Sequence, residues 1–179
     1  MKKMIMMFLM MVGVMAHASS ADYNVRDYGA KGDGKTLDHQ AINAAIDSCV
    51  AHGGGRVVVP AGTYLCGSIR MKSHVELHLS AGAKILAAPA SMKAYDEAEH
   101  WEGPAYQDGG HTYFKNSLIY AIGQEHVSIT GRGMIDGQGL TKKDTEKGGV
   151  VNGGNIGTGD KAIAFKLCRN ILIRDVSID

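Results

Sequence analysis

The chain has 179 residues, and its 19 lysines and arginines against 18 aspartates and glutamates give a formal net charge of +1. This balance argues against a nucleic-acid-binding protein, which usually carries a large basic surplus. The 24 glycines show no period of three, which excludes collagen, and only 3 prolines argue against a disordered linker. Since 45% of the residues are apolar, we expect a globular, turn-rich protein with a packed core.

Residues 1–21 have the pattern of a secretion signal. Lys2 and Lys3 give a positive start, Met4 to Met15 form an uncharged apolar run, and Ala16-His17-Ala18 is a small-x-small cleavage pattern. The run is too short for a good membrane span, so stable membrane insertion is not expected. We expect cleavage after Ala18 or Ala21 and an exported protein, periplasmic or extracellular.

The next segment is predicted to form a strand, a turn and one helix. Residues 24–28 are a strand candidate, and residues 29–34 are a turn. Apolar residues then recur at helical spacing, which predicts an amphipathic helix at about residues 36–50 with Thr36 as its N-cap. The run Gly53-Gly54-Gly55 is expected to end the helix.

From Arg56 onward the sequence indicates short β-strands separated by glycine, serine, asparagine or aspartate. Runs of this length cannot pair in long hairpins. The predicted strands cover residues 57–59, 63–69, 74–79, 84–87, 118–122, 127–130, 134–135, 162–167, 171–174 and 176–178.

A weak internal repeat links three of these strands. The segments that begin at Ser73, Glu125 and Arg169 share two polar residues followed by alternating apolar positions. Short strands over a repeating coil are typical of a parallel β-helix, in which each coil stacks on the last. A β-sandwich is the alternative, but it would require longer strands and clearer hairpin turns.

The stretch from Gly29 to Thr36 matches the phosphate-loop pattern GxxxxGK[ST] in full and precedes a helix. We reject the nucleotide interpretation for three reasons. The strand candidate before it is half charged rather than buried, no apolar strand ending in aspartate follows to hold magnesium, and the signal directs the chain away from nucleotide.

The three cysteines are Cys49, Cys66 and Cys168. An odd number cannot form a closed disulfide framework, and the absence of a CxxC pair in the sequence argues against a structural zinc site. Pairing of Cys49 with Cys66 is compatible with an oxidising compartment. Buried free thiols on apolar faces explain the same residues at least as well.

Several stretches carry a resemblance to a known family. Residues 25–36, 41–46 and 54–64 resemble the opening of pectin-degrading right-handed parallel β-helix proteins, an opening shared with phage tailspikes and some lyases. Residues 67–79 and 127–139 are similar to the polygalacturonases of glycoside hydrolase family 28. The most specific stretch is Ile135-Asp136-Gly137-Gln138-Gly139. The resemblance runs from about Tyr23 to Asp179.

The resemblance implies an all-β fold, a right-handed parallel β-helix with an N-terminal capping α-helix. Residues 22–179 would be the N-terminal part of the β-helix domain, which would be truncated at its C-terminal end. Glycines would occupy tight corners, at Gly131, Gly133, Gly137 and Gly139. Apolar side chains would point inward in stacked rows, at Val75, Leu77, Val127, Ile129, Ile171 and Ile173.

The resemblance also implies inverting hydrolysis of galacturonosyl linkages, which needs an acid and a base carboxylate on opposite sides of the scissile bond. None of the family's four catalytic motifs occurs in the chain, and the histidine motif is approached only by Gly109-Gly110-His111-Thr112. Asp136 and Asp160 match no catalytic motif. We therefore assign no catalytic residue and no cofactor, and expect the fragment to be inactive.

The resemblance also implies a partner for the full-length protein, an acidic plant polysaccharide that is either galacturonan (pectin) or rhamnogalacturonan. Two other functions remain open on the same fold. One is a calcium-dependent polysaccharide lyase, and the other is a non-catalytic glycan-binding or tailspike-like β-helix.

Two groups of side chains are weak site candidates. The segment 95–114 is rich in aromatic residues, and Trp101, Tyr106 and His111 could line a sugar cleft. Packing of this segment on the wall of the solenoid is the favoured interpretation. The alternating residues His74, Glu76 and His78 could hold a metal, but a solvated outer face explains them better, so we predict no metal site.

Overall fold

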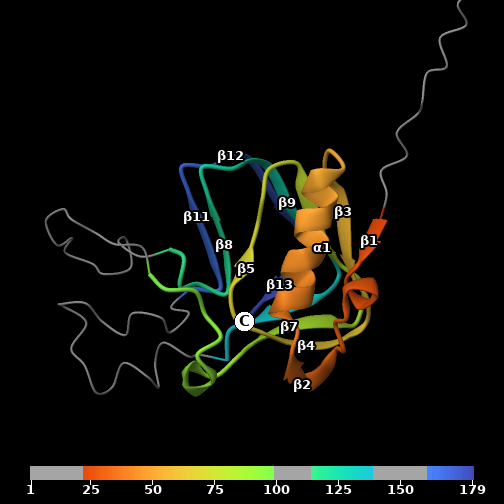
Figure 1. The fold of residues 1–179 in the computed structure, drawn as a ribbon, viewed down its shortest axis with the longest axis vertical. Coiled ribbons are helices and arrows are strands. Elements are labelled where there is room, and N and C mark those ends of the chain that lie inside the picture. The colour runs from red at the N-terminus through yellow and green to blue at the C-terminus, as the bar shows by residue number, and fades with distance from the viewer. Residues whose placement is uncertain (1–21, 99–113, 139–160) are drawn as a thin grey trace, which may run out of the picture.

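A computed structural model describes residues 22–98, 114–138 and 161–179, and Figure 1 shows the course of the chain through them. In chain order the elements of these ranges are β1 (Asp22–Asn24), the 3-10 helix η1 (Val25–Tyr28), β2 (Asp33–Leu37), α1 (His39–Ala51), β3 (Gly55–Val59), β4 (Gly62–Cys66), β5 (Ile69–Arg70), β6 (Val75–Leu79), β7 (Ala83–Ala87), the 3-10 helix η2 (Ala90–Met92), β8 (Ile119–Ile122), β9 (Glu125–Gly131), β10 (Met134–Asp136), β11 (Ile163–Lys166), β12 (Arg169–Arg174) and β13 (Ser177–Ile178).

The strands form three sheets, named here A, B and C. Sheet A has the order β1-β3-β6-β9-β12, sheet B the order β2-β4-β7-β10-β13, and sheet C the order β5-β8-β11. The strand pairs of the described ranges are all parallel, and from β3 onward the chain visits the sheets in turn. The fold is therefore a right-handed parallel β-helix, as predicted. Parallel pairing is incompatible with the alternative β-sandwich.

The internal repeat marks one corner of the coil. Strands β6, β9 and β12 follow this corner in successive coils and stack in sheet A, with Leu77 beside Ile129 and Ile129 beside Ile173. The residue before each apolar run has a left-handed backbone, with φ of 63° at His74, 54° at His126 and 55° at Asn170. The repeated polar residues are therefore corner residues, and the apolar residues after them enter the core.

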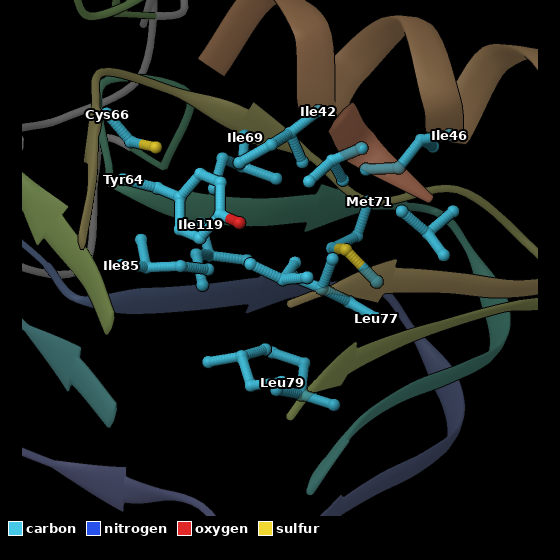
Figure 2. Packing of buried hydrophobic residues seen from close by; sticks show 14 of the residues in the cluster. Ile42, Ile46, Tyr64, Cys66, Ile69, Met71, Leu77, Leu79, Ile85 and Ile119 are labelled. Atoms are coloured by element: carbon cyan, nitrogen blue, oxygen red, sulfur yellow. The ribbon is translucent and has the colours of Figure 1, made fainter. Parts of the chain in front are cut away.

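The core fills the inside of the coil. Figure 2 shows side chains from α1 and from all three sheets meeting there, and Val75, Leu77, Val127 and Ile129 are at most 1% exposed, as predicted. Burying one side chain of this size contributes about 1.5–3 kcal/mol. The predicted inward positions Ile171 and Ile173 keep the register of the row, but they are 37% and 42% exposed, since β12 forms one edge of sheet A.

Helix α1 covers one end of the coil, and Ile42 and Ile46 are fully buried beneath it. The predicted helix was placed too early. Thr36 lies on β2, where its hydroxyl donates to Asp33 Oδ2, and Asp38 holds the N-cap position. As predicted, the helix ends at the glycine run, where the Gly53 and Gly54 N–H groups bond to helical carbonyls.

Three local predictions differ from the structure. Residues 24–28 are not a strand, because the Asn24 side chain accepts from the Arg26 N–H and starts the 3-10 helix η1. The predicted turn at residues 29–34 leads into an unpredicted strand, β2, whose sequence is polar because it lies at the edge of sheet B. The predicted run 63–69 is two strands, β4 and β5, in different sheets.

The predicted corner glycines have different roles. Gly131 has φ of 110°, and a Cβ there would lie 2.0 Å from the Leu79 carbonyl oxygen. Gly133 has an ordinary φ, but its Cβ would lie 2.6 Å from Leu79 Cβ, so crowding by the previous coil requires glycine there. Gly137 has neither a left-handed φ nor a close contact, and Gly139 lies outside the described residues.

The cysteines are free thiols in this structure, with Cys49 and Cys66 buried. Burial raises the pKa of both buried thiols. The predicted signal lies outside the described residues. Among the helices of the described ranges, none combines the length and apolar character needed to cross a membrane.

Candidate functional site

The segment that matches the phosphate-loop pattern is closed by the chain's own carboxylates. Asp38, 1% exposed, accepts hydrogen bonds from the N–H groups of Lys31 at 2.7 Å and Gly32 at 2.9 Å. Asp33 accepts from the N–H groups of Lys35 and Thr36, which lower its pKa to about 2. These four N–H groups therefore already have acceptors and are not available to a phosphate.

The three weak site candidates Trp101, Tyr106 and His111 lie outside the described residues, as does Asp160. Tyr95 of the same segment belongs to the core, and its hydroxyl donates to the Ala88 carbonyl at 2.7 Å. This residue packs in the core of the β-helix, and the interpretation of the rest of the segment stays a prediction.

The residues His74, Glu76 and His78, for which a metal site was considered and rejected, do not share a single strand face. His74 lies at the corner before β6, while Glu76 and His78 point outward from β6. On this outer face of sheet A, Glu76 accepts from Arg56 Nε at 3.1 Å and from the Thr130 hydroxyl at 2.5 Å, and His78 Nδ1 lies 2.9 Å from that hydroxyl. The described residues include no group of three or more side chains suited to a metal ion.

The sheet C cluster, composed of Arg70, Asp96 and Tyr120, lies on the outer face of sheet C. Arg70 on β5 and Tyr120 on β8 are direct neighbours in register, and both point outward because Ile69 and Ile119 beside them are buried. Arg70 donates to both oxygens of Asp96, from Nε at 2.7 Å and from Nη2 at 2.5 Å. The Tyr120 hydroxyl donates to Asp96 Oδ2 at 2.8 Å.

Buried polar groups hold this cluster in place. The Ser68 hydroxyl accepts from the Asp96 N–H at 3.0 Å and donates to the Ser117 carbonyl. Asn43 of α1 joins the helix to β5, since its Nδ2 donates to the Ser68 carbonyl and its Oδ1 accepts from the Arg70 N–H. The cluster is thus fixed from the helix, from two strands and from the segment after η2.

The electrostatics of the cluster favour permanent charge on Asp96 and Arg70. Partial burial opposes ionisation of Asp96, but hydrogen bonds from Arg70 and Tyr120 outweigh it and lower its pKa. The Asp96 carboxylate raises the pKa of Arg70. Burial and the Asp96 bond raise the pKa of Tyr120 to about 12, so the phenol stays protonated as a donor.

This arrangement suits binding and positioning rather than proton transfer. A general acid for glycoside hydrolysis needs a carboxyl group with a raised pKa. The described carboxyl groups with a shifted pKa are all shifted downward, at Asp33, Glu76, Asp96 and Asp136. Asp136 is bonded to Lys84 at 2.9 Å, so it has a structural partner. The absence of catalytic residues from the chain stays a prediction.

Sequence reasoning did not find the sheet C cluster. Arg70 and Tyr120 stand in unremarkable positions of two short strands, and Asp96 lies far from both in sequence. A usable signal existed in the alternation of β8, because a tyrosine between buried Ile119 and Ala121 must face outward. The pairing of β5 with β8, which brings Arg70 beside it, needed the three-dimensional coil.

Comparison with known proteins shows the family to which the chain belongs. The family model described as rhamnogalacturonase A/epimerase, pectate lyase-like, matches residues 23–152. The chain belongs to this family. The predicted resemblance to polygalacturonase-like, pectin-degrading β-helix proteins is thereby confirmed.

Three relatives illustrate the similarity. The exo-poly-α-D-galacturonosidase of Dickeya chrysanthemi is 35% identical over 136 residues, covering 72% of this chain and 21% of the relative. The exopolygalacturonase of Thermotoga maritima matches with a TM-score of 0.65 and 29% identity, over 88% of this chain and 41% of its own. The family 28 exopolygalacturonase of Yersinia enterocolitica matches with a TM-score of 0.65 and 25% identity, over 88% and 34%. The chain spans less than half of the length of each of these relatives.

Proposed function

We propose that this chain is the N-terminal part of an exported glycoside hydrolase that cleaves galacturonan-type pectic polysaccharide by inversion. Residues 1–21 would be the signal and residues 22–179 the first coils of the β-helix. The catalytic acid and base would come from coils that follow. The support is the family membership together with the two exopolygalacturonase structures, each matched over 88% of this chain.

The sheet C cluster carries the proposal for substrate contact. Arg70 has a side chain 53% exposed, and its charge is fixed by Asp96 on the outer face of the sheet. The segment after η2 reaches this face, since Asp96 accepts hydrogen bonds there from both Arg70 and Tyr120. A guanidinium is the side chain best suited to the carboxylate of a uronic acid. We therefore assign Arg70 a substrate-binding role in the complete enzyme.

The open edge of the coil supports the proposal that further coils follow. Ile171, Ile173 and Ile178 are 37%, 42% and 52% exposed, whereas the core residues beside them in the previous coil, Val127, Ile129 and Ile135, are fully buried. A stacked next coil would bury the exposed row and pair the free edges of β11, β12 and β13.

Activity measurements on two lengths of the protein test the proposal. We expect the 179-residue chain to release no reducing ends from polygalacturonate, and the product of the complete reading frame to release them. In the longer protein, Arg70→Gln should raise KM with a smaller effect on kcat, because Arg70 would bind rather than transfer protons. A reading frame that stops after Asp179, or an inactive longer product, would overturn the hydrolase proposal.

Two rival functions give different results in the same assay. A calcium-dependent lyase would form an unsaturated product that absorbs in the ultraviolet and would stop when a chelator is added. A glycan-binding β-helix would bind pectic oligosaccharides without cleaving them. Export is tested separately, by locating the mature protein and sequencing its N-terminus, which should begin after Ala18 or Ala21.

A further inference from the structure

A stack of side chains runs along the corner between sheet C and sheet A. His74 and His126 occupy equivalent corners of successive coils, and their rings stack with centroids 5.2 Å apart and planes at 18°. Asn170 takes the same position in the next coil, with Nδ2 3.3 Å from His126 Nε2. Both imidazole rings belong to exposed residues, so this stack forms part of the outer surface.

The stack lacks a side chain at its first position. Gly54 precedes β3 as His74 precedes β6, and its φ is 97°. A Cβ on Gly54 would lie 2.5 Å from the His74 carbonyl oxygen and 2.8 Å from His74 Cβ, so the backbone of the next coil excludes any larger residue. The side of the His74 ring that faces the first coil is therefore not covered by a corner side chain.

An open hollow lies at this place. It has a volume of about 410 Å³ and is lined by Gly55, Arg56, His74, Val75, Glu76, His126 and Ser128. We call it the corner hollow. Its lining combines two flat aromatic rings, one guanidinium, one hydroxyl and the Glu76 carboxylate. Rings suit the apolar face of a pyranose, and polar groups suit its oxygens.

The guanidinium of Arg56 is available to a ligand in the corner hollow. Arg56, whose side chain is 44% exposed, uses Nε for Glu76, and within the described residues its two terminal nitrogens make no hydrogen bond or ion pair. Glu76 is occupied by Arg56 and Thr130, and Glu125 is bonded to Arg169. Asp22, beside Arg56 in sheet A, is exposed to solvent. A carboxylate can therefore reach the outer edge of the guanidinium, where two parallel bonds are favoured.

We propose that the corner hollow is a binding site for one uronic acid ring, separate from the sheet C face. The pyranose would lie on the His74 imidazole as the missing member of the stack, with its carboxylate on the terminal nitrogens of Arg56. The choice of a uronic acid rests on the proposed function, since galacturonan is made of such rings. A second site away from the cleavage face would hold a polymer on the enzyme between cuts.

Titration with two monosaccharides tests this site. Galacturonate and galactose differ only at carbon 6, a carboxylate in the first and a hydroxymethyl group in the second. We expect galacturonate, added to the 179-residue chain, to shift the imidazole NMR signals of His74 and His126 and to leave those of His52 unchanged. Galactose should bind more weakly. Equal affinities for the two sugars, or no shift at either imidazole, would overturn the proposal.

Two variants and a control separate the contacts. His74→Asn removes the ring but keeps a residue that tolerates the left-handed corner, as Asn170 shows. It should weaken galacturonate several-fold, since an aromatic contact contributes about 0.5–1.5 kcal/mol. Arg56→Gln should abolish the preference for galacturonate over galactose, and His52→Ala should change neither. Wild-type binding by His74→Asn would refute the stacked geometry. Since no step involves cleavage, this result is independent of the hydrolase assay.

Discussion

Removal of the Asp38 carboxylate should destabilise the fold far more than removal of a surface aspartate with similar bonds. Asp38 is 1% exposed, and its two oxygens accept from the N–H groups of Lys31 and Gly32. In Asp38→Ala both N–H groups lose their partner in a partly buried place. Each unsatisfied group costs about 1–3 kcal/mol, so the expected loss is about 2–6 kcal/mol. That is a large part of the stability of an ordinary domain, about 5–15 kcal/mol.

Asp33→Ala is the matched control. Asp33 also accepts from two backbone N–H groups, but it is exposed, so water can replace its carboxylate and the loss should be smaller. Asp38→Asn should fall between, because its amide oxygen can still accept one bond. Equilibrium unfolding in urea, followed by circular dichroism at neutral pH, measures all three. If Asp38→Ala lost no more stability than Asp33→Ala, the carboxylate would not hold this loop and the reasoning would be refuted.

Two further predictions compare paired positions, and a third concerns Tyr120 alone. Gly131→Ala should destabilise more than Gly29→Ala, because both have a left-handed φ, worth about 1–2 kcal/mol, but only at Gly131 does the new Cβ meet a backbone oxygen, at 2.0 Å. Ile129→Ala should cost about 2–5 kcal/mol and Ile173→Ala clearly less, since the first is fully buried and the second 42% exposed. The pKa of Tyr120 is raised to about 12 from an unfolded value of about 10, so its stabilisation is complete below about pH 10 and is lost as pH rises to 12. Tyr120→Phe should remove that part of the alkaline loss, measured as unfolding free energy against pH.

Each of these three predictions also has a contrary result. Equal losses at the two glycines would mean that the coil can move away from the new methyl group. Equal losses at the two isoleucines would mean that the inward row is not buried as described. An unchanged alkaline profile in Tyr120→Phe would show that the hydrogen bond to Asp96 does not hold the phenol proton.

The β-helix could be predicted from sequence because its signals are local. The alternation of Val75 and Leu77 fixes which face is inside, and the repeat at Ser73, Glu125 and Arg169 fixes which strands stack. The residue at which the helix begins was harder to predict from sequence. Thr36 is a common N-cap residue, but the buried bonds of Asp38 to a preceding loop decided the boundary, and such bonds join residues that no periodicity relates.

The candidate sites could not be predicted from sequence, because they depend on contacts between coils. The pairing of Arg70 with Asp96 depends on a segment that folds back over sheet C, and the stack of His74 on His126 depends on the number of residues in a full coil. The polar residues of the repeat were visible in the sequence, but their left-handed corners were not, since a left-handed φ is uncommon for any residue other than glycine.

The connections between sheets B and C suggest a route to engineered variants. In the first coil this connection is only Gly67-Ser68, whereas later coils use residues 88–118 and 137–162 at the same corner. The strands on either side stay in register despite this difference, as the pairing of β5 with β8 and of β8 with β11 shows. Lengthening a loop costs little free energy once its ends are fixed. This corner is therefore the natural place to graft a foreign peptide without disturbing the coil.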